Sequence, residues 1–188
     1  MKKVTIIIAS ILFVSFTQAQ TQFGIKGGIN LSTVTGDNSS NFSSAISAYA
    51  GGLANIAFDK KFALQPEVMI SFEGTKFNGG SFNTTYLNLP VLGHMNAGSG
   101  FIIQSGPQFG LLLGAQQKYD KVGSTNVKDQ LKSLNFSWVF GTGYQLPNSG
   151  MGFSLRYNLG FSNMNANTAI TSHTSNWQVG VFYMFSKK

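Results

Sequence analysis

Two carboxylates, Glu67 and Glu73, are the residues best suited by type to acid–base chemistry, because both lie on the polar face of an alternating segment, FALQPEVMISFEG. An extended strand rises about 3.3 Å per residue, so six residues separate the two by about 20 Å. The carboxyl pairs of glycosidases lie within roughly 10 Å of each other, so these two cannot form such a pair. We expect Glu67 to be a structural carboxylate paired with Arg156 or Lys26, with a proton or ion relay as the alternative.

The chain has only two histidines, His94 and His173, and no cysteine. We expect His94 on the polar face of a strand near a short turn, and His173 in a loop. Neither has the partners of a nucleophilic triad, and two isolated histidines do not make a metal-ligand set. The glycine clusters lack the strand–helix context of phosphate-binding loops. The sequence therefore predicts no catalytic residue, no metal and no cofactor, and a protein that is not an enzyme.

Eight segments alternate apolar and polar residues with the two-residue period of a β-strand. They span residues 23–31, 48–58, 62–74, 86–95, 101–115, 134–146, 151–161 and 177–185. Each is close to the roughly 9–11 residues that cross a bilayer at a tilt. Pro66, Pro90 and Pro107 lie inside three of these segments, where each removes a ladder donor. We expect bulges or strand ends at these prolines.

Composition decides which face of each strand points inward. Only 10% of the residues are charged, against roughly 25% in ordinary soluble domains. The apolar faces are nearly pure Phe, Leu, Ile, Val, Trp and Tyr, a surface that would aggregate in water but suits lipid. The sequence therefore predicts an all-β fold, an eight-stranded antiparallel up-and-down transmembrane β-barrel whose narrow lumen is filled by side chains. We expect a lumen charge cluster of Lys26, Glu67, Glu73 and Arg156, and interface aromatics at Trp138, Tyr144, Tyr157, Trp177, Tyr183 and Phe185.

The two charged residues after Met1, the apolar run that follows and the small residues up to Ala19 predict a secretory signal peptide, residues 1–19, which leaves 20–188 as the barrel domain. Long and short connections alternate along the chain. Outer-membrane barrels have long extracellular loops and short periplasmic turns, so we expect an outer-membrane location with both termini in the periplasm. In the longest connection, VKDQLKSL at residues 127–134 predicts a short amphipathic helix that packs on the barrel rim rather than binding a partner.

Several motifs occur in order along the chain: FGIKGGINLS, LQPEVMIS, YLNLPVL, SGPQFGLLLGA, FGTGYQL and LRYNLGFSN. Together they resemble the PorT-like outer-membrane β-barrel family of Bacteroidetes, from Phe23 to Phe185. The resemblance implies an eight-stranded barrel in the outer membrane and no single activity, although the family's namesake takes part in protein secretion and gliding-type export. Phe185 is followed by Ser-Lys-Lys, which departs from the terminal aromatic that is usual in outer-membrane barrels.

We expect a small integral outer-membrane protein with a structural or partner-interaction role. Its expected partners are outer-membrane lipid and proteins of the envelope or the secretion machinery, and the barrel is expected to be monomeric. A narrow pore for ions or very small solutes is the alternative, which a packed lumen disfavours. A lipid-facing enzyme is a third possibility, and the lack of a triad disfavours it. The net charge of +7 is scattered rather than clustered, so the sequence predicts no nucleic-acid partner.

Overall fold

A computed structural model describes residues 20–36, 42–119, 123–163 and 172–185. The expected signal peptide, residues 1–19, lies outside the described residues. The long strands are β1 (Gln20–Gly36), β2 (Phe42–Ala57), β3 (Phe62–Phe77), β4 (Gly80–Gly98), β5 (Phe101–Tyr119), β7 (Leu134–Gln145), β8 (Met151–Gly160) and β9 (Ser172–Met184). A short strand, β6 (Gly123–Asn126), and one 3₁₀ turn, η3 (Lys128–Gln130), lie between β5 and β7.

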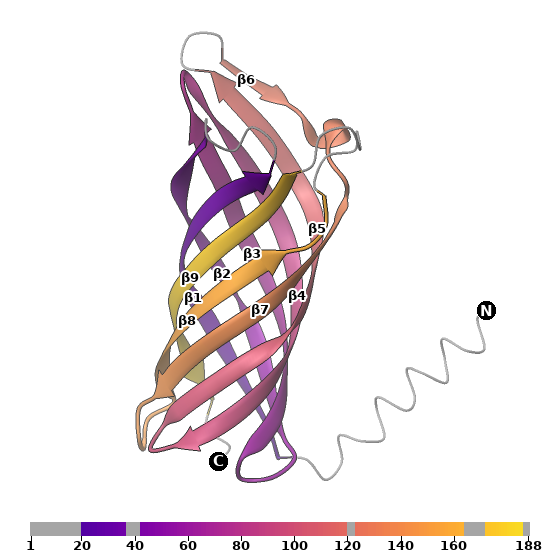
Figure 1. The fold of residues 1–188 in the computed structure, drawn as a ribbon. Helices are drawn as coiled ribbons and strands as arrows, with labels where there is room; N and C mark the ends of the chain where they lie inside the picture. The colour runs from indigo at the N-terminus through magenta and orange to yellow at the C-terminus, as the bar shows by residue number, and fades with distance from the viewer. Residues whose placement is uncertain (1–19, 37–41, 120–122, 164–171, 186–188) are drawn as a thin grey trace, which may run out of the picture.

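The long strands form one antiparallel sheet that closes on itself. Each strand pairs with the next in the chain, β4 pairs with β5, and β1 pairs with β9 to complete the ring (Figure 1). Closure gives every long strand two neighbours, so the backbone N–H and C=O groups of the wall can form hydrogen bonds without water. The predicted eight-stranded antiparallel up-and-down barrel is confirmed. Within the described ranges, no helix has the length and apolar character needed to cross a membrane.

Side chains alternate between the two faces of the wall as the period of two requires. On β3, Ser71 is 0% exposed and its neighbour Phe72 is 49% exposed. On β7, Val139 is 0% exposed and Phe140 is 51% exposed. Large apolar side chains therefore point outward and mainly polar ones point into the lumen, which is the reverse of a water-soluble barrel.

The connections differ between the two ends of the barrel. The turns at residues 58–61, 99–100 and 146–150 lie at the end where β1 begins and β9 finishes, which we call the short-turn end (Figure 1). At the opposite end, the long connection expected between the segments at 62–74 and 86–95 is wrong, because β3 and β4 continue to a two-residue turn at Asn78–Gly79. Gly79 has a φ of +86°, and Asn-Gly is the characteristic pair of such hairpin turns.

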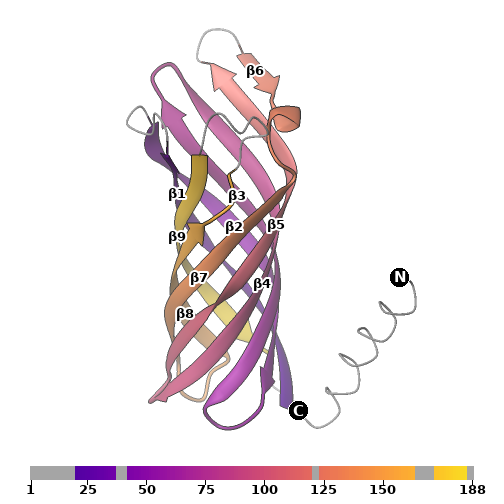
Figure 2. The ribbon, with the colours of Figure 1, turned by 45° about the vertical axis from the view of Figure 1, so that its right-hand side comes forward.

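The β3–β4 hairpin and the paired strands β5 and β6 project from the rest of the wall at this hairpin end (Figure 2). His173 also belongs to a strand rather than a loop. It lies in β9 and pairs with Thr35 of β1, so its predicted location is wrong. Polar residues on both sides of these extensions hide the alternation from which strands are predicted.

The prolines do not mark bulges or strand ends, so that prediction is wrong. The three prolines lie well inside their strands: Pro66 in β3, Pro90 in β4 and Pro107 in β5. Beside each of them some residue pairs of the ladder are missing, but the strands keep the same register on both sides of the gap. The register shift between β4 and β5 on the hairpin side lies instead at Thr85 and Tyr86. A proline removes one donor from the ladder, and the neighbouring strands of a closed sheet keep the register.

The connection after β5 packs on the rim without forming the expected amphipathic helix. Within residues 127–134, where the helix was expected, only Lys128–Gln130 is helical, as a single 3₁₀ turn. Val127 is buried in a small apolar cluster with Tyr86, Leu112 and Ala115. The loop therefore covers one part of the hairpin end, and its helical spacing reflects an apolar contact rather than an extended helix.

Candidate functional site

A buried ion-pair network crosses the lumen nearer the short-turn end than the hairpin end. Glu67 projects inward from β3, Arg156 from β8 and Lys26 from β1. Arg156 Nη1 donates to Glu67 Oε2 at 2.8 Å, and Arg156 Nη2 donates to Glu67 Oε1 at 2.7 Å. Lys26 Nζ donates to Glu67 Oε2 at 3.1 Å. One carboxylate thus receives a bidentate guanidinium and an ammonium, the stronger class of protein hydrogen bonds.

Two glutamines complete this network, and sequence reasoning did not single them out. Gln104 Oε1 on β5 accepts from Arg156 Nε at 3.0 Å and from Arg156 Nη2 at 2.7 Å. Gln65 Nε2 donates to Glu67 Oε1 at 2.7 Å. Buried charges are tolerated where hydrogen bonds satisfy their remaining donors and acceptors. The only sequence signal for the two glutamines was that each lies on the polar, lumen-facing side of its alternating strand.

Glu73 does not join this network. Its Oε1 accepts from Ser71 Oγ at 3.1 Å and from Asn88 Nδ2 at 3.4 Å, and no described cation forms an ion pair with it. Asn30 Nδ2 also donates to Ser71 Oγ, at 3.0 Å. The structure therefore brings three of the four residues of the expected cluster together and places Glu73 in a separate layer of neutral polar groups.

His94 lies beside the network on the short-turn side. Its Nδ1 is 3.0 Å from Gln65 Oε1, 3.3 Å from Asn55 Nδ2 and 3.4 Å from Gln104 Nε2. These neighbours are amides, so the ring has a structural rather than a triad-like environment. The part of the chain that the structure describes contains no group of three His, Cys, Asp or Glu side chains that could hold a metal ion.

Residues 16–166 match the family described as outer membrane protein beta-barrel domain. The chain belongs to this family. It is therefore a small outer-membrane β-barrel protein.

The fold of this outer-membrane barrel is similar to two solved structures. Neisserial surface protein A is 14% identical with a TM-score of 0.54, and the match covers 87% of this chain and 97% of that one. Ail, the attachment invasion locus protein of Yersinia pestis, is 13% identical with a TM-score of 0.52, over 87% of this chain and 98% of that one. Identities this low show the fold alone. Comparison with curated proteins gives no significant match.

The aromatic side chains expected at membrane interfaces form ring contacts on the outer-membrane barrel. Toward the short-turn end, the ring centroids of Tyr144 and Phe101 lie 5.0 Å apart, and those of Tyr183 and Phe185 lie 5.7 Å apart. Nearer the hairpin end, the rings of Tyr157 and Trp177 lie 4.9 Å apart. Trp138 Nε1 donates to Ser105 Oγ at 2.9 Å. Such pairs suit the aromatic girdles of outer-membrane barrels, and their membrane role stays a prediction.

The network links strands on opposite sides of the lumen of this outer-membrane barrel. Glu67 on β3 and Arg156 on β8 are 89 residues apart in sequence, and their side chains are 0% and 2% exposed. This arrangement can hold the wall in shape and fill the cross-section. It presents no exposed nucleophile or general base to a substrate.

Proposed function

We propose that this outer-membrane barrel has a structural or partner-binding role and that its lumen is closed to solutes. The observation that carries the proposal is the buried contact of Glu67 with Arg156 and Lys26 across the lumen. A permeating ion or solute would have to separate this contact. Leaving one member of a buried ion pair without its partner costs about 3–5 kcal/mol, which disfavours steady conduction.

Partial apolar cover on the hairpin side supports the same proposal. Val127, Tyr86, Leu112 and Ala115 form a buried apolar cluster at that end. It covers the β4–β5 side of that end, where apolar side chains resist wetting. The lumen therefore meets a charged obstruction nearer the short-turn end, and apolar side chains cover part of the hairpin end.

The projecting hairpins support a role in partner binding at the hairpin end. Their exposed side chains are mostly polar, among them Lys76, Asn83, Lys118 and Thr125. Such extensions are longer than a barrel needs in order to close. We propose that they face the cell exterior and that both termini lie in the periplasm, in line with the short periplasmic turns and longer extracellular connections of known outer-membrane barrels.

Further parts of the proposal rest on the sequence. The motifs that resemble the PorT-like family favour envelope or secretion-machinery proteins as partners, besides outer-membrane lipid. Every long strand of the barrel is already paired on both sides, which favours a monomer. The absence of a triad around His94 favours a protein without catalytic activity. Phospholipase activity in the purified, refolded protein would refute that last point.

Conductance in planar bilayers tests the closed lumen. The refolded protein should give no steady unitary currents. A variant with Lys26, Glu67, Arg156 and Gln104 all changed to Ser removes the charges of the network and serves as the control in which currents should rise. Steady, large currents from the unaltered protein would contradict the proposal and favour the narrow pore.

Labelling and crosslinking in native membranes test orientation and partners. A cysteine introduced at Asn78 should react with a membrane-impermeant reagent on intact cells, and one introduced at Ser149 should not. The opposite pattern would reverse the orientation. An amine-reactive crosslinker should give discrete adducts that weaken when Lys76 and Lys118 are changed to Gln. No adduct at all would leave only a role in supporting the bilayer.

A further inference from the structure

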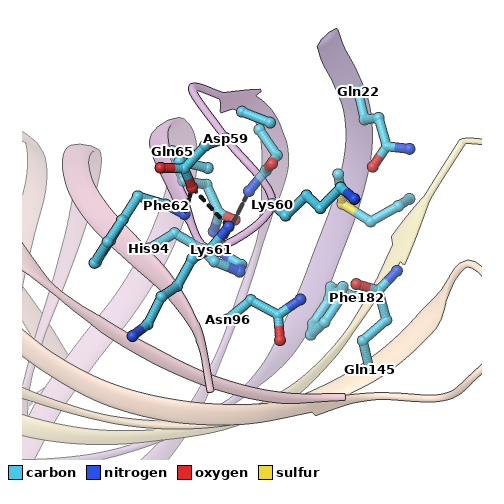
Figure 3. A pocket seen from close by; sticks show the side chains of 14 residues that line it. Gln22, Asp59, Lys60, Lys61, Phe62, Gln65, His94, Asn96, Gln145 and Phe182 are labelled. Carbon is cyan, nitrogen blue, oxygen red and sulfur yellow. Dashed lines mark hydrogen bonds between the residues drawn. The ribbon is translucent and has the colours of Figure 1, made fainter. Parts of the chain in front are cut away.

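The short-turn end contains a polar cavity of about 180 Å³ (Figure 3). Its floor includes Gln65 and His94, the residues next to the buried ion-pair network. Pockets for drug-sized molecules measure roughly 300–1,000 Å³, and a water molecule takes about 30 Å³ of liquid. The cavity therefore fits a small group, or one end of a longer molecule that leaves through the mouth.

One wall of this cavity offers hydrogen-bond donors and a positive charge. Lys60 extends from the turn after β2 toward Gln22 of β1 (Figure 3). Among the described residues, the Lys60 ammonium forms no ion pair. The side chain of Gln22 on the same side of the cavity has no hydrogen-bond partner, and neither has that of Gln145 on the other side. These groups can donate to a bound oxygen atom.

The carboxylate of Asp59 on the rim keeps its negative charge and is hydrogen-bonded within the turn. Asp59 Oδ1 accepts from the backbone N–H of Lys61 at 2.6 Å and of Phe62 at 2.7 Å. The Lys61 ammonium lies 5.7 Å from the centroid of the Phe62 ring. The formal charges of Asp59, Lys60 and Lys61, which all line the cavity, leave +1 at the mouth, and this charge favours a singly charged anion.

The opposite wall is apolar. Phe182 and Met184 of β9 line it, and Ala57 and Ala63 add small apolar side chains at the base of the β2–β3 turn. Figure 3 shows Phe182 beside Gln145 and across the cavity from Lys60. A ligand that uses both walls needs an anionic group joined to a small apolar group.

We propose that this cavity binds a carboxylate that carries a small apolar group, as in the C-terminal residue of an extended polypeptide. The carboxylate lies at Lys60 and the Gln22 amide, and the apolar group lies against Phe182. Capture of a terminal carboxylate by donors is a known mode of peptide recognition. The cavity exists in either orientation of the barrel. In the proposed orientation it opens to the periplasm, so a failed orientation test would leave binding itself unaffected.

Titration of the refolded, isotope-labelled barrel in micelles, followed by amide NMR shifts, tests this binding. The probes are N-acetyl-alanyl-alanine with a free carboxylate, the same peptide as its C-terminal amide, and inorganic phosphate. The acid should saturate shifts at Asn96 and Phe182, and it should bind about tenfold more tightly than the amide, as expected when a charge-assisted hydrogen bond is lost. Phosphate should bind more weakly than the acid, because it makes no use of the apolar wall.

Substitutions localise the effect. Lys60→Gln should weaken binding of the acid about fivefold, the upper range for an exposed ion pair, and Lys60→Arg should restore it. The matched control is Lys128→Gln, which removes the same charge at the hairpin end and should change nothing. The proposal fails if the amide binds as tightly as the acid, if phosphate competes equally, or if Lys128→Gln has the effect of Lys60→Gln.

Discussion

The ion-pair network gives a sharp prediction, because two cations share one carboxylate. Arg156 contacts Glu67 through two hydrogen bonds of 2.8 and 2.7 Å, whereas Lys26 contacts it through one of 3.1 Å. Replacing Glu67 leaves two buried cations without a counter-charge. Replacing Lys26 leaves the bidentate pair intact and removes a like charge from beside Arg156. The cost of losing each residue should therefore differ strongly.

The magnitudes follow from the burial of the three side chains. Glu67→Gln should lower the free energy of unfolding by about 3–5 kcal/mol, the usual cost of breaking a buried ion pair from one side. Lys26→Met should cost about 1 kcal/mol or less, because the apolar replacement packs near the Tyr49 ring, which lies 5.6 Å from the ammonium. Arg156→Met should fall between the two, since Lys26 and Gln65 still contact Glu67.

Urea titration of the barrel in phospholipid vesicles, followed by tryptophan fluorescence and extrapolated to water, measures these free energies. Asp129→Asn is the matched control, because it removes an exposed carboxylate of η3 and should shift stability by no more than about 0.5 kcal/mol. The reasoning is refuted if Lys26→Met costs as much as Glu67→Gln, or if Glu67→Gln is as mild as the control.

Three further perturbations test the packing of the wall, the rim and a turn. Gly180→Ala should lower the free energy of unfolding by about 1–3 kcal/mol in thermal unfolding, because the new Cβ would meet the Tyr49 side chain. Gly114 has open space around it, so Gly114→Ala should be neutral. Equal effects of the two substitutions would contradict this packing. Val127→Ser should leave the barrel folded but speed tryptic cleavage of the loop after β5, and unchanged cleavage would argue against the rim cluster. Backbone donors, Phe62 first, lower the pKa of the exposed Asp59 carboxyl. Because the folded pKa is depressed, this stabilisation holds above the unfolded value of about 3.9 and fades only as pH falls through the lower folded value. The hydrogen-bonded amide shift of Phe62 should therefore persist to below pH 3.9, and its loss above that pH would count against the contact.

The strands and their faces were predictable because a two-residue period is a local property. The segment at 151–161 corresponds to β8 (Met151–Gly160), and that at 134–146 to β7 (Leu134–Gln145). The extensions of β3 and β4 were missed because residues 75–85 carry polar side chains on both faces, and no apolar alternation marks them. Asn78–Gly79 was the available signal, and it indicates a hairpin turn rather than a loop.

The sequence predicted which charged residues face the lumen better than it predicted which of them contact each other. The alternation of inward and outward side chains along each strand places Lys26, Glu67 and Arg156 in the lumen. Whether they touch depends on how strands that are far apart in sequence are staggered along the barrel axis. The six-residue spacing that rules out a catalytic pair also sets Glu73 about 20 Å along the strand from Glu67. That spacing was sufficient to separate Glu73 from the cluster. Gln104 could not be ranked above other lumen amides without the register of β5.

The central claim is that the apolar face of this closed wall contacts lipid and the polar face is enclosed. Because the chain has no cysteine, a single introduced cysteine can carry a nitroxide spin label at Ser71, Phe72, Val139 or Phe140. Collision with oxygen and with a water-soluble nickel complex in lipid vesicles then reports the surroundings of each site. The labels at Phe72 and Phe140 should collide often with oxygen and rarely with nickel, and those at Ser71 and Val139 should be shielded from both. The reversed pattern, or a water-soluble monomer in which Phe72 and Phe140 are the shielded positions, would contradict the account.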